Sequence, residues 1–386
     1  MTSVRDFSSW IELSESAYRN NILFVKREIG AQSDLGVVIK ANAYGHGLLP
    51  VARMAADNGV RCFFVQTVDE ALELRAAGFR HDIVTLGHVP SSRFQDAVRE
   101  EIQIALFNVK VLQDLIDAAR RTGKRASCHV KLETGFHRQG INENELSMCL
   151  KQMRNTNDVE LKALYTHFSS GDDPDDSEYV KYQLGKFRTM VQIAVHEGFG
   201  NVHQHLAGTA AMLLFPETLR HMTRLGIGQY GLWPSKATAR HFAEHRSGQD
   251  AGRLQPVLSW QTIVCQVKWV EKGSPIGYGC SHAARRRTRL AVIPVGYADG
   301  YDRGLSNRGH VLIHGKRASI LGRVCMNITM VDVTDIPEAT EDDEVVLLGR
   351  QKGETVTADD LGDMLDTINY EIVARINSAL PRVVVA

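Results

Sequence analysis

Eight short runs of apolar and β-branched residues alternate with helix-like segments in the first part of the chain, and this alternation constrains the fold more than any other feature. The runs are residues 36–41, 62–67, 83–87, 102–106, 128–133, 163–168, 202–207 and 224–228. The segments with helical periodicity are 68–77, 110–122, 143–154, 180–198 and 210–221. Alternating strands and helices predict parallel strands joined by right-handed crossovers, and eight such repeats close a (β/α)8 TIM-like barrel. A doubly wound open sheet is the competing fold.

The pattern changes after Pro234. A polar, basic and helix-poor linker over residues 236–252 precedes β-rich runs and one late helix. The runs are residues 257–270, 288–295, 310–313, 318–333 and 344–348, and the helix lies near 358–374. Such runs predict a mainly antiparallel C-terminal β domain. We therefore predict an α/β barrel domain over residues 1–245 and a β domain over residues 246–386.

Charge and hydropathy exclude several classes of partner. The 386 residues carry 45 Lys+Arg and 45 Asp+Glu, and this balance disfavours nucleic acids and anionic membranes as partners. No run approaches the roughly 18 apolar residues of a membrane helix. Arg5 and Asp6 stand where a signal peptide would be apolar. We expect a cytoplasmic protein that acts on a small molecule.

The cysteines and histidines do not form a recognisable metal site. The 6 cysteines are scattered without a C-x-x-C pair, which indicates reduced thiols. His129, His203 and His205 lie in strand-like runs, but no cysteine or carboxylate pattern completes a ligand set. We expect these histidines to be packed or supporting groups, and we predict no bound metal.

Lys40 is the first candidate for chemistry. The reactive groups of a barrel lie at the carboxyl ends of its strands, and Lys40 directly follows the apolar residues 37–39. A charged amine there is costly unless it is paired, deprotonated or used covalently. An isolated lysine at a strand end usually extends its amine to solvent. Here Tyr44 follows in a glycine-flanked turn, and a lysine at a barrel mouth is suited to a Schiff base with pyridoxal phosphate.

The eighth run leads into a candidate phosphate-binding turn. Gly226, Gly228 and Gly231 form a G-x-G-x-x-G pattern, which is weak as a dinucleotide signature because Pro234 interrupts any following helix. Barrels commonly bind phosphate after the last strand, and Thr209 adds a hydroxyl group. A tight turn without a ligand is the alternative interpretation of these glycines.

Several motifs together resemble the alanine racemase family. They are VVIKANAYGHG (37–47), ETGFHRQG (133–140), THFSSGDD (166–173), RLGIGQYGLWPS (224–235), PIGYG (275–279), GYADGYDR (296–303), GRVCMN (322–327) and NYEI (369–372). The resemblance covers residues 37–381 and both predicted domains. It implies a pyridoxal 5'-phosphate enzyme with a barrel and a β domain, which supplies D-alanine for peptidoglycan.

The resemblance implies two catalytic bases. Lys40 would hold the cofactor and serve as one base, and Tyr278 of the neighbouring subunit would be the other, so the active form would be a head-to-tail homodimer. Racemisation removes a proton from one face of a planar intermediate and returns one to the opposite face. A lysine and a tyrosine on opposite faces can serve both directions if their pKa values approach the working pH.

The same resemblance assigns further roles. Arg224 would be the partner of the pyridine nitrogen, and because a guanidinium cannot accept a proton it would keep that nitrogen neutral. His167 would contact the tyrosine and the ring, and Lys131 would be a possible carbamylation site beside Arg138. The other cofactor contacts would be Tyr44, Thr209, Gly226, Ile227 and Tyr370, and the substrate-side residues Arg138, Met326, Tyr297 and Tyr301.

Three positions depart from the family pattern. Asn327 stands where an aspartate is common, Glu133 replaces an aspartate, and Gly208 replaces an asparagine. These changes bear on substrate range, so a racemase of serine or of broader specificity is an open alternative. An amino-acid decarboxylase and a non-enzymatic pyridoxal phosphate carrier are alternatives from other classes. A carrier of this kind consists of the barrel without a β domain, so the residues after the linker argue against it.

Overall fold

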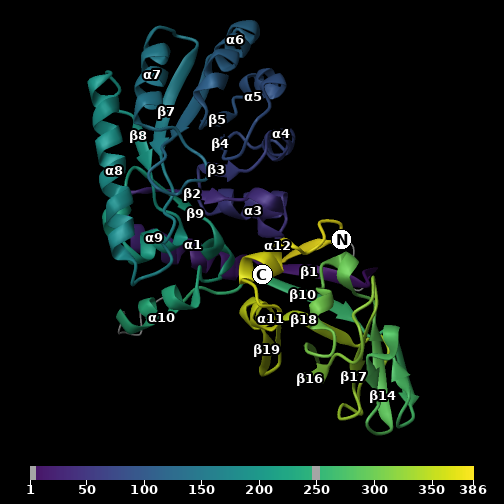
Figure 1. Cartoon of the computed structure of the whole chain (residues 1–386). Helices are drawn as coiled ribbons and strands as arrows, with labels where there is room; N and C mark the ends of the chain where they lie inside the picture. The colour runs from purple at the N-terminus through teal and green to yellow at the C-terminus, as the bar shows by residue number, and fades with distance from the viewer. Residues whose placement is uncertain (1–5, 246–252) are drawn as a thin grey trace. The chain divides into compact units, whose positions relative to one another are not determined.

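The computed structural model describes residues 6–245 and 253–386, which form two compact units (Figure 1). One unit comprises residues 19–41 and 51–255, and the other comprises residues 1–18, 42–50 and 256–386. The second unit is therefore not continuous in sequence, whereas we predicted one boundary near residue 245. The reason is strand β1 (Ser9–Ser14), which pairs with β10 (Leu258–Ile263) and β20 (Arg382–Val385).

The first unit contains the predicted barrel. Its strands are β2 (Asp34–Val38), β3 (Cys62–Val65), β4 (Asp82–Thr85), β5 (Gln103–Leu106), β6 (Ala126–Lys131), β7 (Val159–Tyr165), β8 (His203–His205) and β9 (Met222–Leu225). All ladders are parallel, in the order β8-β7-β6-β5-β4-β3-β2-β9. Between β8 and β9 the backbone N–H of Arg224 donates to the carbonyl of Ala207 at 3.0 Å. The barrel prediction is confirmed over the open sheet.

Helices line the outside of these strands (Figure 1). The helices in this part of the chain are α1 (Glu15–Ile29), α2 (Lys40–Tyr44), α3 (Leu48–Asp57), α4 (Val68–Ala76), α5 (Phe94–Arg99), α6 (Leu112–Thr122), α7 (Glu143–Arg154), α8 (Ser177–His196), α9 (Thr209–Leu214) and α10 (Lys236–His245). The strands are mostly buried, and every residue of β3 and of β5 is buried. Such burial is typical of a parallel sheet covered by helices.

Two helix predictions in this unit need correction. The helix predicted over residues 210–221 ends at Leu214 because Pro216 follows and cannot continue it. The linker predicted to be helix-poor contains α10. Ser235 Oγ accepts the backbone N–H of Thr238 at 3.0 Å, and Phe242 packs edge-on against Phe24, so a cap and an apolar contact stabilise this helix. Residues 246–252 of the predicted linker lie outside the described residues.

The second unit is mainly antiparallel, as predicted. Besides β1, β10 and β20 its strands are β11 (Gln266–Val270), β12 (Pro275–Ile276), β13 (His282–Ala283), β14 (Thr288–Ile293), β15 (His310–Ile313), β16 (Lys316–Ser319), β17 (Thr329–Asp332), β18 (Glu344–Gln351) and β19 (Glu354–Val356). The sheets have the orders β16-β15-β18-β10-β1-β20, with β19 on β18, then β11-β14-β17 and β12-β13. The β1–β20 ladder is parallel.

Two elements of this unit are shorter than predicted. The run 318–333 divides into β16 and β17, because the chain turns at Gly322, whose φ is +77°. A side chain does not fit at this turn, since a Cβ would lie 2.5 Å from the carbonyl oxygen of Ile276. The helix near 358–374 divides into α11 (Ala358–Leu365) and α12 (Asn369–Ala374), because Asp366 is left-handed with φ 56°. No helix in residues 6–245 or 253–386 is long and apolar enough to cross a membrane.

Candidate active site

Lys40 lies immediately beyond the carboxyl end of β2, as predicted. Its strand is held on both sides, because the backbone N–H of Ile39 donates to Phe64 at 2.9 Å and the carbonyl of Val38 accepts from the Gln229 side chain at 3.0 Å. Burial and the charge of Arg138 lower the pKa of the Lys40 amine. The amine therefore loses its proton more readily than an exposed lysine does.

The backbone after Lys40 is strained. In α2 the four residues Ala41, Asn42, Ala43 and Tyr44 have φ values of 54°, 53°, 53° and 54°, so this short helix is left-handed. A left-handed helical conformation costs about 1–2 kcal/mol per non-glycine residue. The Asn42 side chain offsets part of this cost by accepting the backbone N–H of Leu48 at 2.8 Å. Strain of this kind gathers at functional sites.

Arg224 is buried in the barrel and surrounded by neutral acceptors. Its Nη1 donates to the carbonyl of His205 at 2.7 Å and lies 2.6 Å from Nδ1 of the same residue. Its Nη2 donates to the carbonyls of Thr166 and Leu206 at 2.7 and 2.9 Å and lies 3.3 Å from Nδ1 of His167. Among the described residues the Nε–H has no hydrogen-bond partner. Burial lowers the pKa of Arg224 to about 10, so the group stays charged at neutral pH.

Four predicted site residues gather around His167. Burial, together with the charges of Arg224, Arg138, Lys131 and Lys40, holds the pKa of His167 well below its usual range. His167 is therefore neutral, and since Nδ1 faces a donor of Arg224, Nε2 carries the hydrogen. The charges of these four residues therefore act on one histidine of the barrel.

Lys131 and Arg138 occupy different environments within this group. Lys131 is buried, and burial together with Arg138 and Arg224 lowers its pKa to about 8. Its Nζ donates to the side chain of Gln139 at 3.3 Å, a contact that the sequence did not predict. Arg138 is exposed, and its guanidinium lies 4.1 Å from the ring centre of Phe136.

Thr209 and the glycine turn form a compact cradle. The Thr209 hydroxyl accepts the backbone N–H groups of Gly226 at 3.0 Å and Gly228 at 3.4 Å. A Cβ at Gly228 would lie 2.7 Å from Cγ2 of Thr209, so the close approach requires glycine. Ile227, between them, is buried at the start of the short 3-10 helix Ile227–Tyr230. This donor-rich turn after β9 suits a phosphate group.

The second unit contains the other predicted residues. The backbone N–H of Tyr297 donates to the carbonyl of Cys325, the residue before Met326, at 3.0 Å. Gly279, which follows Tyr278, lies close to Arg323, because a Cβ there would lie 3.2 Å from the guanidinium carbon. The exposed fractions of Tyr278, Tyr297 and Met326 are 72%, 43% and 57%. Within this unit, Tyr297 and the neighbour of Tyr278 thus contact the segment 322–327, which carries Met326, and all three side chains are exposed.

Three more tyrosines of this unit are partly or fully enclosed. The rings of Tyr44 and Tyr370 lie 6.1 Å apart, and burial raises the pKa of Tyr44 to about 12. The segment that carries Tyr44 fits closely, because a Cβ at Gly45 would lie 1.9 Å from the carbonyl oxygen of Val373. Tyr301, predicted at the substrate entry, is 1% exposed and packs against Trp260. Its burial corrects that expectation.

Comparison with known proteins agrees with this geometry. Residues 13–234 match the alanine racemase N-terminal domain and residues 257–384 match the C-terminal domain. The chain belongs to the alanine racemase family. It is therefore an isomerase of the racemase class, as predicted. An alanine racemase of Symbiobacterium thermophilum is 37% identical over 374 residues, which are 97% of this chain and 96% of that protein. Alanine racemase 1 of Oceanobacillus iheyensis is 33% identical and covers 99% of both chains.

Solved alanine racemase structures share the fold of both units. The enzyme from a D-cycloserine producing Streptomyces lavendulae has a TM-score of 0.90 at 31% identity and covers 100% of this chain and 98% of its own. The alanine racemase from Bartonella henselae, with covalently bound pyridoxal phosphate, has a TM-score of 0.83 at 25% identity and covers 98% of this chain and 100% of its own.

The three departures from the alanine racemase pattern have local explanations. Asn327 donates through Nδ2 to Asp299 at 3.2 Å, where an aspartate would face a like charge. Glu133 accepts the backbone N–H of Gly135 at 2.6 Å. At Gly208 a Cβ would lie 3.3 Å from the His167 ring, so a larger residue would press on that histidine.

Proposed function

We propose that this chain interconverts L-alanine and D-alanine with pyridoxal 5'-phosphate as its cofactor. The observation that carries the proposal is the grouping of three features on one barrel. Lys40 has a lowered amine pKa, Arg224 has an Nε–H without a partner among the described residues, and the Thr209 hydroxyl meets a glycine turn. They fit the aldehyde, the ring nitrogen and the phosphate of this cofactor, and membership of the family supports the same assignment.

The roles of the barrel residues follow from their chemistry. When bound, the cofactor supplies an electron sink for the substrate α-carbon. Lys40 would hold the cofactor and, once free, take or return the α-proton on one face. Arg224 would donate its Nε–H to the ring nitrogen and, as a guanidinium, leave it unprotonated. The cradle of Thr209, Gly226 and Ile227 would bind the phosphate, and Tyr44 and Tyr370 would add contacts.

The second base is assigned to Tyr278 of a partner copy in a homodimer. Racemisation needs acid–base groups on opposite faces of the α-carbon, and one lysine serves only one face. The exposed fraction of Tyr278 is 72%, which supports its availability to another subunit. His167 presents an Nε2–H that can hold the tyrosine oxygen. Arg138, Tyr297 and Met326 would bind the substrate side.

Lys131 is assigned as a carbamylation site. A carbamate forms from the neutral amine, and the pKa of about 8 leaves a useful fraction of this amine unprotonated near neutral pH. The carbamate would be an anion that attracts Arg138, whereas the protonated amine of Lys131 repels it.

The alternative with a specific observation behind it is a racemase of serine or of broader specificity. Asn327 removes a negative charge that the family pattern carries, and Gly208 leaves room beside His167. Decarboxylation and a carrier role have less support, because the chain has a full second unit with an exposed Tyr278.

Chiral chromatography tests the reaction. Purified protein supplied with pyridoxal phosphate is incubated separately with L-alanine, L-serine, L-lysine and L-arginine. We expect rapid racemisation mainly of alanine, and loss of both racemisation and the yellow cofactor colour in Lys40→Ala. The exposed control variant Lys110→Ala should match the wild type. Unchanged racemisation in Lys40→Ala would contradict the assignment, and faster conversion of serine would favour the alternative substrate.

The cellular role is proposed on family membership alone. Supply of D-alanine for peptidoglycan in the cytoplasm predicts that the gene restores growth of a bacterial strain that needs added D-alanine. A Lys40→Ala gene should fail to restore growth, and rescue by that variant would contradict the role.

A further inference from the structure

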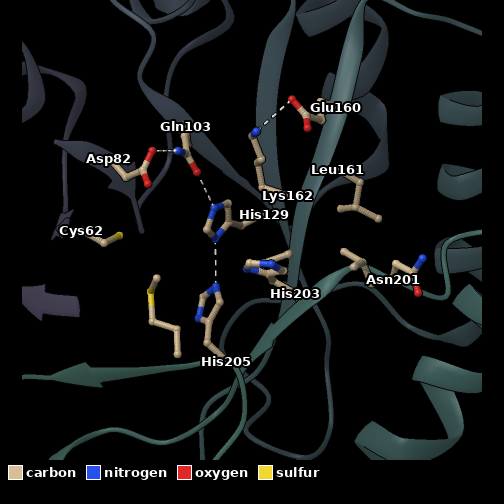
Figure 2. A pocket seen from close by; sticks show the side chains of 13 residues that line it. Cys62, Asp82, Gln103, His129, Glu160, Leu161, Lys162, Asn201, His203 and His205 are labelled. Carbon is tan, nitrogen blue, oxygen red and sulfur yellow. Dashed lines mark hydrogen bonds and ion pairs between the residues drawn. The ribbon is translucent and has the colours of Figure 1, made fainter. Parts of the chain in front are cut away.

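A row of polar side chains in the barrel interior connects Arg224 to other strands. Arg224 Nη1 lies 2.6 Å from Nδ1 of His205, and His205 Nε2 lies 2.8 Å from Nδ1 of His129. His129 Nε2 lies 2.7 Å from Oε1 of Gln103, and Gln103 Nε2 donates to Oδ1 of Asp82 at 2.7 Å. Figure 2 shows the part from Asp82 to His205. These contacts form one continuous hydrogen-bonded row over β4, β5, β6, β8 and β9.

The two ends of the row determine its direction. A carboxylate such as Asp82 only accepts hydrogen bonds, and the guanidinium of Arg224 only donates them. The Gln103 amide therefore turns its NH2 toward Asp82 and its oxygen toward His129. His129 then carries its hydrogen on Nε2 and accepts at Nδ1. By the same reasoning, His205 carries its hydrogen on Nε2 and offers Nδ1 to Arg224.

Burial keeps both imidazoles in the form that this row needs. The exposed fractions of His129 and His205 are 5% and 1%. Burial lowers the pKa of His129 to about 3 and holds that of His205 well below its usual range. Each ring is therefore neutral, with one donor and one acceptor. In this direction every ring nitrogen of the two histidines has a complementary partner.

The far end of the row lies in a cavity of about 360 Å³ at the amino ends of the strands (Figure 2). Five lining residues each begin a strand: Cys62, Asp82, Gln103, His203 and Met222. Asp82 is exposed there, whereas Gln103, His129 and His205 are buried. The row thus leads from an exposed carboxylate at the amino ends of the strands to the buried cation near their carboxyl ends.

We propose that Gln103 and His129 are positioning residues that hold Arg224 by fixing which nitrogen of His205 carries the hydrogen. If the row ran in the opposite direction, His205 Nδ1–H would face Nη1–H of Arg224 across 2.6 Å, and the guanidinium would have to move. This inference rests on the proposed function, in which Arg224 contacts the ring nitrogen of pyridoxal phosphate.

Two charged variants at one position test the direction of the row. Gln103→Glu supplies an acceptor to His129 and preserves the direction, whereas Gln103→Lys supplies only donors and reverses it. The two variants place charges of opposite sign beside Asp82, so the tautomers are measured in each variant together with its thermal unfolding, which separates a reversed row from a folding defect. Long-range nitrogen–proton NMR of protein labelled in its histidine rings reports the tautomers without cofactor. Binding of pyridoxal phosphate is then titrated by absorbance.

We expect the Nε2–H tautomer at His129 and His205 in the wild type and Gln103→Glu, and the Nδ1–H tautomer at both in Gln103→Lys. Gln103→Lys should bind pyridoxal phosphate roughly tenfold to a hundredfold more weakly, the effect of losing a hydrogen bond to a charged group, and Gln103→Glu should stay close to the wild type. The Nδ1–H tautomer in the wild type, or equal affinities in the two variants, would overturn the proposal. Absent racemisation by the wild type would instead contradict the proposed function, because the tautomers are measured without turnover.

Discussion

Arg224 and Lys131 are two cations that the barrel interior holds in different ways. In residues 6–245 and 253–386 Arg224 has no ion-pair partner, and it donates to three carbonyls while two imidazole nitrogens face it. Buried charges are tolerated when most of their donors are hydrogen-bonded, as both Nη groups of Arg224 are, and a guanidinium is more weakly hydrated than an ammonium. Arg224 therefore stays charged, whereas burial and neighbouring guanidinium groups lower the pKa of Lys131 to about 8.

Lys131 makes stability depend on pH. An unfolded lysine titrates near 10.5, so between pH 8 and 10.5 the unfolded chain binds more protons than the folded one, and the free energy of unfolding rises with pH. Relative to Lys131→Met, the free energy of unfolding of the wild type should rise by about 2 kcal/mol from about pH 7 to about pH 10. Urea denaturation in bicarbonate-free buffer measures this difference. Lys110→Met, at an exposed position, should follow the wild type, and a difference that does not change with pH would contradict the assignment.

Two helices of the barrel, α4 and α7, begin at capping boxes, in which side chains pair with the free backbone N–H groups of the first turn. In α4 the Thr67 hydroxyl accepts the backbone N–H of Glu70 at 3.2 Å, and the Glu70 carboxylate accepts that of Thr67 at 3.2 Å. Asn142 and Glu145 form the same capping box at α7. These boxes satisfy N–H groups that the first turn leaves without partners, so they determine where the helix begins.

Removal of the cap at α4 should destabilise the first unit. We expect Thr67→Ala to lower the free energy of unfolding by about 1 kcal/mol, because the N–H of Glu70 loses its acceptor. Thr67→Ser keeps the hydroxyl and should retain most of the stability. Urea denaturation of both variants measures the effect, and equal losses would indicate that the threonine methyl group, rather than the cap, contributes the stability.

At the scale of the whole molecule, the second unit exposes large side chains that a single copy does not cover. Tyr278, Tyr297 and Met326, which lie on or next to the segment 322–327, are exposed. A cluster of exposed apolar side chains commonly marks an interaction site. A closed dimer with two-fold symmetry would present this surface of each copy to the other. The proposed homodimer therefore places Tyr278 of one copy at the barrel of its partner.

Mixing two inactive variants tests the shared site. Lys40→Ala and Tyr278→Phe each remove one base, but one site of a heterodimer would combine the intact Lys40 with the intact Tyr278. Random exchange of subunits should therefore restore about a quarter of the wild-type activity. Native mass spectrometry measures heterodimer formation. Heterodimers without restored activity would contradict the shared site.

Local patterns in the sequence were sufficient for the barrel, for its strand order and for the position of Lys40, because strand and helix periodicity and the crossover rule act over short segments. The sequence also placed Thr209 just beyond the seventh run and Arg224 and the glycine turn at the eighth run. Only the tertiary structure grouped residues 1–18 with the C-terminal unit, and only it showed the left-handed turn after Lys40.

The hydrogen-bonded row from Asp82 to Arg224 likewise came from the tertiary structure. Its members lie on five strands far apart in sequence, and each alone resembles an ordinary packed polar residue. Whether a buried polar group has a partner depends on strand register and side-chain direction across the barrel. Spacing along the chain does not contain that information, so the sequence determined the elements and the fold determined which side chains meet.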